Sequence, residues 1–107
     1  MKKLKFYQHL AKMILDGTKT TTWRLFDDKN LSVGDEVICV NTQTNEEFSK
    51  IKIISVKETT LGKLSKDEFQ GHEEFNSKKE MYETYRKYYG DKVGPETPLK
   101  VIKFEVL

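Results

Sequence analysis

The sequence predicts one α+β domain whose sheet curls into a small barrel of about five to six mostly antiparallel strands, with two to three helices beside it. Three observations lead to this prediction. Short β-forming segments are separated by turns, apolar residues recur at helical spacing in a few stretches, and a strand-like segment ends the chain. A length of 107 residues suits a single hydrophobic core, so we expect one domain over residues 1–107.

The amino-terminal segment predicts a short strand followed by a helix. Residues 4–7 can form the strand. Apolar residues then recur at three- and four-residue steps, at Leu10, Met13 and Ile14. Gly17 stands where such a helix commonly ends, because glycine adopts the left-handed conformation required there at little cost.

The middle of the chain predicts a strand entered from a turn and then a hairpin. Threonines and a tryptophan favour a strand within residues 18–25. Residues 36–40 and 48–57 are expected to be the hairpin strands, joined by the polar loop 42–46. In the second hairpin strand the apolar residues change pleat parity, which indicates a bulge near Ile53.

The last third predicts two helices and a final strand. Residues 64–70 can form a short helix. A longer helix is expected to start at a capping box, in which the Ser77 side chain accepts from a backbone amide and Glu80 reaches back. Its tyrosines recur at helical spacing until Gly90, another expected helix-ending glycine. Residues 101–106 alternate as a strand, with Ile102, Phe104 and Val106 on one face.

The composition limits the possible functions. Nineteen basic residues against seventeen acidic ones leave a net charge of only +2, so a nucleic-acid site would have to be local. Cys39 is the only cysteine, which excludes an internal disulfide and a cysteine-rich zinc cluster. The two histidines form no recognisable metal motif, and we expect no metal and no other cofactor. No long apolar stretch is present, so we expect no signal peptide, no membrane span and a cytoplasmic location.

Residues 17–25, GTKTTTWRL, concentrate the candidate chemistry. Strand alternation puts Thr20, Thr22 and Arg24 on one face. If Lys19 still lies in the turn, the pleat does not fix its direction and its flexible side chain can reach Thr22. A desolvated lysine could then take the proton of the threonine hydroxyl and make it a nucleophile toward an acyl carbon. The alternative is a solvated strand edge whose threonines only favour the β conformation.

Other polar and aromatic residues have structural alternatives as well. Trp23 has the parity opposite to Arg24, which favours a core anchor over a platform for a nucleobase. The segment GHEEF, residues 71–75, carries carboxylates that either interact with the dipole of the following helix or face a cleft as a general acid or base. The tyrosine stripe of that helix is expected to be core and rim. Cys39 is expected to be an inert packed thiol.

The order ILDGTKTTTWR, SVGDEV, GHEEF and VIKFEVL resembles the ASCH family (activating signal cointegrator homology) over residues 4–107. The resemblance implies a fold similar to the PUA domain of RNA-modifying enzymes. The family motif Gly-x-Lys-x-x-Glu-x-Arg is matched by Gly17, Lys19 and Arg24. Thr22, however, stands where many members carry glutamate.

One bacterial branch with threonine at this position looks like an amidohydrolase that removes the acetyl group of 4-acetylcytidine. By this resemblance Lys19, Thr22 and Glu73 would be catalytic, with Thr22 as nucleophile, Lys19 activating it and Glu73 passing a proton to the leaving amine. Glu74 is the alternative site carboxylate. Arg24 or backbone amides would stabilise the oxyanion.

The resemblance also implies two other functions, a non-catalytic RNA-binding module and a ribonuclease. In each case a nucleoside or RNA is the expected partner, and the sequence leaves the oligomeric state open between a monomer and a weak dimer. The expected ligand-binding residues are Gly17, Thr20, Arg24, His72 and Glu74. A common fold does not choose among these functions.

Overall fold

The computed structural model describes all residues from 1 to 107. Its elements in chain order are β1 (Lys2–Phe6), α1 (Gln8–Asp16), β2 (Thr21–Leu25), β3 (Glu36–Asn41), β4 (Glu47–Thr60), η1 (Leu61–Lys63, a 3-10 helix), α2 (Lys66–Phe69), α3 (Lys78–Tyr89) and β5 (Pro98–Val106). The predicted α+β class with few short helices is confirmed.

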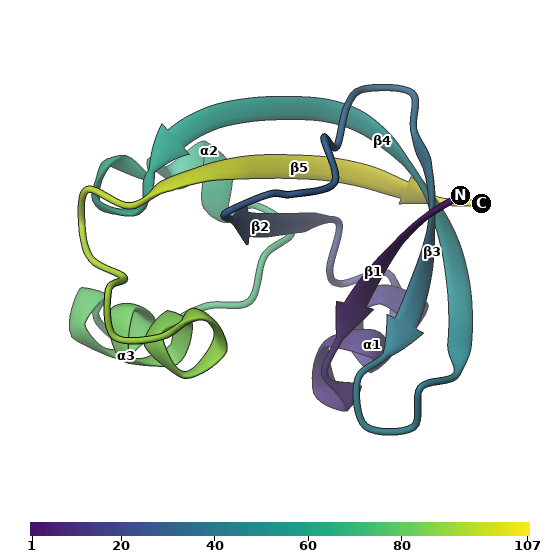
Figure 1. Cartoon of the computed structure of the whole chain (residues 1–107), viewed down its shortest axis with the longest axis horizontal. Coiled ribbons are helices and arrows are strands. Elements are labelled where there is room, and N and C mark those ends of the chain that lie inside the picture. The colour runs from purple at the N-terminus through teal and green to yellow at the C-terminus, as the bar shows by residue number, and fades with distance from the viewer.

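The five strands form one sheet in the order β1-β3-β4-β5-β2. β1 pairs with β3 in parallel, whereas the other neighbours are antiparallel. Figure 1 shows β4 and β5 as long arcs over the molecule, with β1 and β3 at one end and α1 and α3 below. The sheet thus curls into a half-barrel, as expected, and β1 and β2 are its two edges.

A bulge helps to bend the longest pair of strands. The register between β4 and β5 shifts between Ile53 and Ser55, where the sequence predicts a bulge. A bulge adds a residue on one strand only and increases its bend and twist. The bulged Ile54 is 51% exposed, whereas Ile53 is fully buried.

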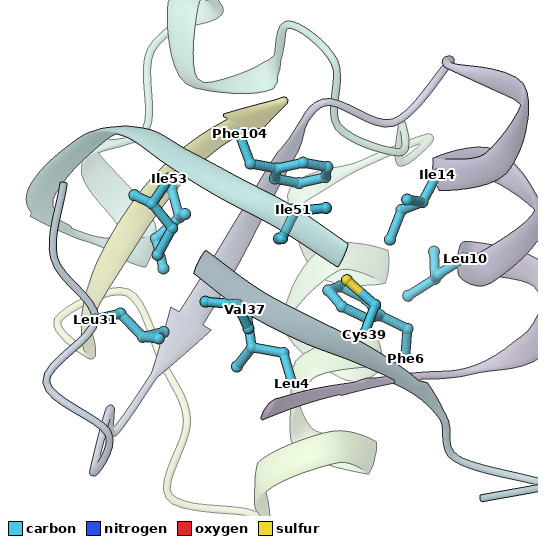
Figure 2. Packing of buried hydrophobic residues seen from close by; sticks show 11 residues of the cluster. Leu4, Phe6, Leu10, Ile14, Leu31, Val37, Cys39, Ile51, Ile53 and Phe104 are labelled. Carbon is cyan, nitrogen blue, oxygen red and sulfur yellow. The ribbon is translucent and has the colours of Figure 1, made fainter. Parts of the chain in front are cut away.

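Two hydrophobic clusters lie on different parts of the sheet. The first joins α1 to β1, β3, β4 and β5, and Figure 2 shows its aliphatic side chains, two phenylalanines and Cys39. Burial raises the pKa of Cys39 to about 12, which fits an inert thiol. The second cluster packs α3 against β2 and β5 around Trp23 and Tyr85. Trp23 is therefore a core residue, as its parity predicts.

The helix ends differ in part from the expectation. Gly17 ends α1 in the left-handed region at φ +86°, and its N–H donates to the carbonyl of Ile14. The Ser77 hydroxyl accepts from the Glu80 amide at 3.1 Å, but the Glu80 carboxylate reaches back to Asn76 instead of Ser77. Gly90 has φ +105° with an extended ψ of 173°, so it is not a left-handed helical cap.

The final strand is longer than the sequence predicts. β5 begins at Pro98, three residues early, because a strand can start at a proline whose missing N–H faces away from the ladder. Leu99 and Val101 belong to the second cluster, and Ile102 and Phe104 to the first. Val106 does not join that face in the core, because it is 48% exposed at the strand end.

Candidate functional site

Lys19 lies in the turn between α1 and β2, as the sequence predicts for a lysine not fixed by the pleat. Its backbone N–H donates to the carbonyl of Met13 at 3.0 Å, and its side chain is only 1% exposed. The ammonium Nζ donates to the carbonyl of Thr21 at 2.8 Å and to Oε1 of Glu73 at 2.6 Å. It forms no hydrogen bond with the Thr22 hydroxyl.

Gly71 attaches the loop before α3 to this turn. Its carbonyl accepts from the amides of both Thr20 (2.8 Å) and Thr21 (3.0 Å). Gly71 has φ +73°, and a Cβ atom there would collide with the Thr20 hydroxyl. The Thr21 hydroxyl also donates to the carbonyl of Gln70 at 2.7 Å. Only glycine therefore allows this approach, which delivers Glu73 to Lys19.

His72 connects Glu73 to the aromatic cluster. Its ring stacks on Trp23 with centroids 3.7 Å apart and planes at 11°. Nδ1 lies 2.9 Å from the carbonyl oxygen of Glu73. Nε2 lies 3.1 Å from the hydroxyl of Tyr85 and 3.2 Å from Oε1 of Glu73. The carboxylate of Glu73 thus lies between a lysine and a histidine.

Burial controls the charges of this group. It lowers the pKa of Lys19, although the Glu73 carboxylate opposes the shift. Burial works to raise the pKa of Glu73, but Lys19 and His72 together bring it below its usual value. Burial and the Lys19 cation lower the pKa of His72 to about 3, so the ring is neutral near pH 7. Burial raises the pKa of Tyr85 well above its usual value, which leaves its hydroxyl protonated.

These charge states define the hydrogen bonds. A neutral His72 whose Nδ1–H donates to the backbone carbonyl of Glu73 leaves Nε2 as an acceptor. Nε2 can then accept the hydroxyl proton of Tyr85. The result is a chain of polar groups running from Tyr85 through His72 and Glu73 to Lys19.

This chain of groups lines a cleft of about 240 Å³ between the two hydrophobic clusters. Phe6 and Leu10 contribute from the first cluster, and Trp23 and Tyr85 from the second. Thr22 lines the cleft too, 4% exposed and without a hydrogen-bond partner for its hydroxyl. A cleft of this volume with aromatic walls and a few polar groups suits a small planar ligand.

Arg24 spans the gap between the two edge strands. From β2, its Nη2 donates to the carbonyl of Lys5 on β1 at 3.1 Å. Its guanidinium carbon lies 4.6 Å above the centre of the Phe6 ring. Its Nε is buried and has no partner. Nη2 makes the only hydrogen bond of this side chain, so other Nη donors of Arg24 stay unused.

Five of the predicted site residues line the cleft: Lys19, Thr22, Arg24, His72 and Glu73. The other three, Gly17, Thr20 and Glu74, do not. Gly17 ends α1 and Thr20 packs against Gly71, so both have local structural roles. Glu74 is exposed, which leaves Glu73 as the carboxylate of the cleft.

The sequence-based prediction missed the wall around β1 and α1. Lys5, Phe6, Tyr7 and Leu10 line the cleft from that side, and Thr42 joins them from the end of β3. The adjacent aromatic pair Phe6-Tyr7 before a helix is the feature of the sequence that could have predicted this wall of the cleft. From the tyrosine stripe, Tyr85 is core, as expected, while Tyr88 and Tyr89 form part of the cleft wall. No group of residues is arranged to hold a metal ion, and no helix is long and apolar enough to cross a membrane.

The fold and the site define an α+β domain of the PUA-like type. The chain belongs to the ASCH domain family, whose model matches residues 2–107. A comparison with curated proteins gave no match.

Solved structures share the fold at low sequence identity. An ASCH domain from Lactobacillus crispatus JV V101 is 20% identical, with a TM-score of 0.73 over 98% of this chain and 79% of that one. A protein from Enterococcus faecalis V583 is 20% identical, with a TM-score of 0.76 over 92% and 70%. ASCH from Zymomonas mobilis is 11% identical, with a TM-score of 0.70 over 97% and 68%. At these identities the likeness extends to the fold alone.

Proposed function

We propose that the cleft binds a cytidine nucleoside or a cytidine exposed in RNA and hydrolyses the acetyl amide of 4-acetylcytidine. The observation that carries the proposal is the contact of 2.6 Å between the buried Lys19 and the partly buried Glu73, beside the unpartnered hydroxyl of Thr22. A buried lysine and carboxylate of shifted pKa in a cleft are typical of acid–base sites. The resemblance to the branch with threonine in the motif supports the same activity.

The aromatic walls provide a site for the base. Tyr7 and Tyr88 line the cleft and stack with centroids 5.2 Å apart, whereas Phe6 is 2% exposed beneath the Arg24 guanidinium. A pyrimidine ring gains stacking energy against such surfaces, about 1–3 kcal/mol per base. We propose that the base lies against these rings, with its acetylated amino group directed toward Thr22.

The proposed reaction begins with a proton transfer within the ion pair. Glu73 takes a proton from Lys19, leaving a neutral amine that accepts the hydroxyl proton of Thr22. The Thr22 oxygen attacks the acetyl carbonyl carbon, and the bond to the cytidine N4 breaks as the Glu73 carboxyl gives N4 its proton. Water then attacks the acetyl ester on Thr22, Glu73 accepts the proton of that water, and the Lys19 ammonium returns one to Thr22. A final transfer from Glu73 restores Lys19, with cytidine and acetate as products.

His72 and Arg24 would support these steps. When Glu73 is protonated, its proton can replace that of the Tyr85 hydroxyl at Nε2 of His72, which lies 3.2 Å from Oε1. Arg24 lines the cleft, and we propose that Nη donors of its guanidinium that form no hydrogen bond in the free protein stabilise the oxyanion on the acetyl oxygen. Lys19 must move toward Thr22 during the cycle, because the two are not hydrogen-bonded in the free protein.

The test is cytidine release from 4-acetylcytidine by the purified protein. We expect Thr22→Ala to lower turnover by about a hundredfold or more while cytidine affinity changes little, because the nucleophile is lost and the walls remain. Thr22→Ser keeps a hydroxyl and should retain part of the turnover. Thr59→Ala, on β4 and outside the cleft, is the matched control. Release no faster than by Lys19→Ala would contradict the proposal.

A non-catalytic RNA-binding module is the second candidate. The missing hydrogen bond between Lys19 and Thr22 favours it, because the nucleophile is not activated in the free protein. In this case RNA affinity should fall steeply with salt, and Arg24→Ala should weaken both affinity and salt dependence. An RNA affinity that changes neither with salt concentration nor in the Arg24→Ala variant would exclude this candidate.

A further inference from the structure

A second concavity, which we call the basic groove, adjoins the cleft. It encloses about 350 Å³. Its polar lining residues are Lys3, Lys5, Arg24, Lys29, Asn45 and Glu47. Lys5 and Arg24 line the cleft as well, so the two concavities meet at these side chains. A ligand that fills the cleft can therefore continue into the groove.

The positive charge of the groove is not compensated. Its only carboxylate, Glu47, is already paired with Lys3 at 2.9 Å. Lys5, Arg24 and Lys29 have no ion-pair partner, although six other lysines of the protein have one. With a net charge of only +2 for the whole chain, this is a local concentration of cations. Such a concentration attracts an anion.

Arg24 has the geometry that an oxyanion requires. The contact with Phe6 and the single hydrogen bond to the carbonyl of Lys5 hold its guanidinium in place between cleft and groove. Its Nε is buried, so the donors that can reach a ligand are those of the Nη groups, and only Nη2 makes a hydrogen bond in the free protein. The planar guanidinium offers paired N–H groups that match two phosphate oxygens.

We propose that the basic groove binds the phosphate group of a nucleotide whose base occupies the cleft. The substrate class is then a phosphorylated cytidine, free or within an RNA strand, instead of the free nucleoside. The proposal rests on the proposed function of the cleft, since it needs a base there. Arg24 at the junction binds the phosphate, and Lys3, Lys5 and Lys29 surround it.

The experiment compares affinities of the full chain for cytidine, its 5′- and 3′-monophosphates, and inorganic phosphate by calorimetry. We expect one monophosphate to bind about tenfold more tightly than cytidine, because hydrogen bonds to a charged group are worth more than those to a neutral one. Lys3→Ala/Lys29→Ala should reduce this advantage by about fivefold while leaving cytidine affinity unchanged, because neither side chain lines the cleft.

The control pair is Lys50→Ala/Lys63→Ala, which also removes one paired and one unpaired lysine. Lys50 is paired with Glu36 at 2.9 Å, and neither lysine lines the cleft or the groove. An equal loss in this control would mean general charge attraction and would overturn the groove as a site. A short cytidine-containing RNA that binds more tightly than either monophosphate would identify the RNA strand as the source of the phosphate; equal affinity would identify the free nucleotide.

The remaining outcomes separate the two proposals. Equal affinity for cytidine and both monophosphates would overturn the phosphate site and leave the proposed function of the cleft intact. Inorganic phosphate binding as tightly as the monophosphates would make the groove a site for free anions and overturn its link to a nucleotide. Failure of all the ligands to bind would overturn both.

Discussion

Two lysines of this protein, Lys19 and Lys100, each hold a carboxylate from a loop, but their surroundings differ. Lys100 on β5 contacts Asp27 at 2.8 Å and also donates to the carbonyl of Leu31. Asp27 accepts two backbone amides besides, from Lys29 and Leu31. Burial works to raise the pKa of Asp27, but the hydrogen bonds from Lys100 and these amides lower it overall.

The pair formed by Lys19 and Glu73 has fewer fixed partners and a different neighbourhood. The Glu73 carboxylate accepts no hydrogen bond from the backbone amide of another residue. Besides Lys19, its close neighbour is the neutral ring of His72. The unpartnered hydroxyl of Thr22 lies in the same cleft. The Asp27 carboxylate is held by backbone amides as well as by a lysine, whereas the Glu73 carboxylate lies in a cleft with fewer fixed partners.

The largest expected effect is that of removing each lysine. Lys19→Met should lower the free energy of unfolding by about 3–5 kcal/mol, because the partly buried Glu73 carboxylate is left without its cation. Lys100→Met should cost less, about 1–2 kcal/mol, because Asp27 keeps its two amide donors. Chemical denaturation of both variants measures the difference.

A double variant separates charge from shape in this prediction. Lys19→Met/Glu73→Gln removes both charges and should recover part of the stability lost in Lys19→Met. If the two single lysine variants lose the same free energy, the distinction between the pairs is wrong.

The next effect concerns pH and the neutral histidine. The pKa of His72 is about 3 in the folded protein, against about 6.5 for an unperturbed histidine. Below pH 6.5 the unfolded chain binds a proton that the folded protein does not, so stability falls as pH falls, by about 1.4 kcal/mol per unit. Between pH 6.5 and 5 we expect a loss of about 2 kcal/mol in the free energy of unfolding.

His72→Gln should flatten this slope, whereas His9→Gln, which alters an exposed histidine, should keep it. Denaturant titrations at both pH values provide the measurement. An unchanged slope in His72→Gln would show that another group is responsible.

A smaller effect is expected where the loop meets the turn. Gly71 and Gly34 both have positive φ, +73° and +91°, but a Cβ at Gly34 would meet nothing within 4 Å. Gly71→Ala should therefore cost about 1–2 kcal/mol more than Gly34→Ala, because it adds a collision with Thr20 to the same backbone strain. Thermal unfolding compares the two, and cytidine affinity should fall in Gly71→Ala alone. An equal loss of stability in both variants would mean that the loop at Gly71 moves to accommodate the added Cβ, and would contradict this prediction.

The smallest effect is expected for Tyr85→Phe. It removes the hydroxyl that lies 3.1 Å from Nε2 of His72 while keeping the ring in the core. The loss should be about 1 kcal/mol in the free energy of unfolding. Tyr82→Phe, on the same helix and outside this hydrogen bond, is the control, and a similar loss in both would assign the effect to α3 generally.

Much of the fold could be predicted because its signals are local. Gly17 ends a helix through its own conformation, and the change of parity at Ile53 marks a bulge within one strand. The capping error at Glu80 is also local, since its carboxylate had two neighbouring backbone amides within reach and bonds the earlier one. The wall formed by β1 could not be predicted, because it depends on which strands meet when the sheet curls.

The site was predictable in its members and less so in its contacts. The motif placed Lys19 and Thr22 together, but the partner of the lysine is the carboxylate 54 residues away. Which of Glu73 and Glu74 faces inward depends on the anchoring of the loop at Gly71, which neighbouring residues alone do not determine. Trp23 is core and cleft wall at once, because both faces of β2 are covered.

The anchoring at Gly71 has a kinetic consequence. A single carbonyl joins two consecutive amides of the Lys19 turn to a loop some fifty residues later, so the site closes only after a long loop of chain has been ordered. Contacts of such sequence separation form slowly relative to helices and hairpins. The α1 helix and the β3–β4 hairpin can exist before the cleft does, and we expect ligand binding to return last when the chain refolds.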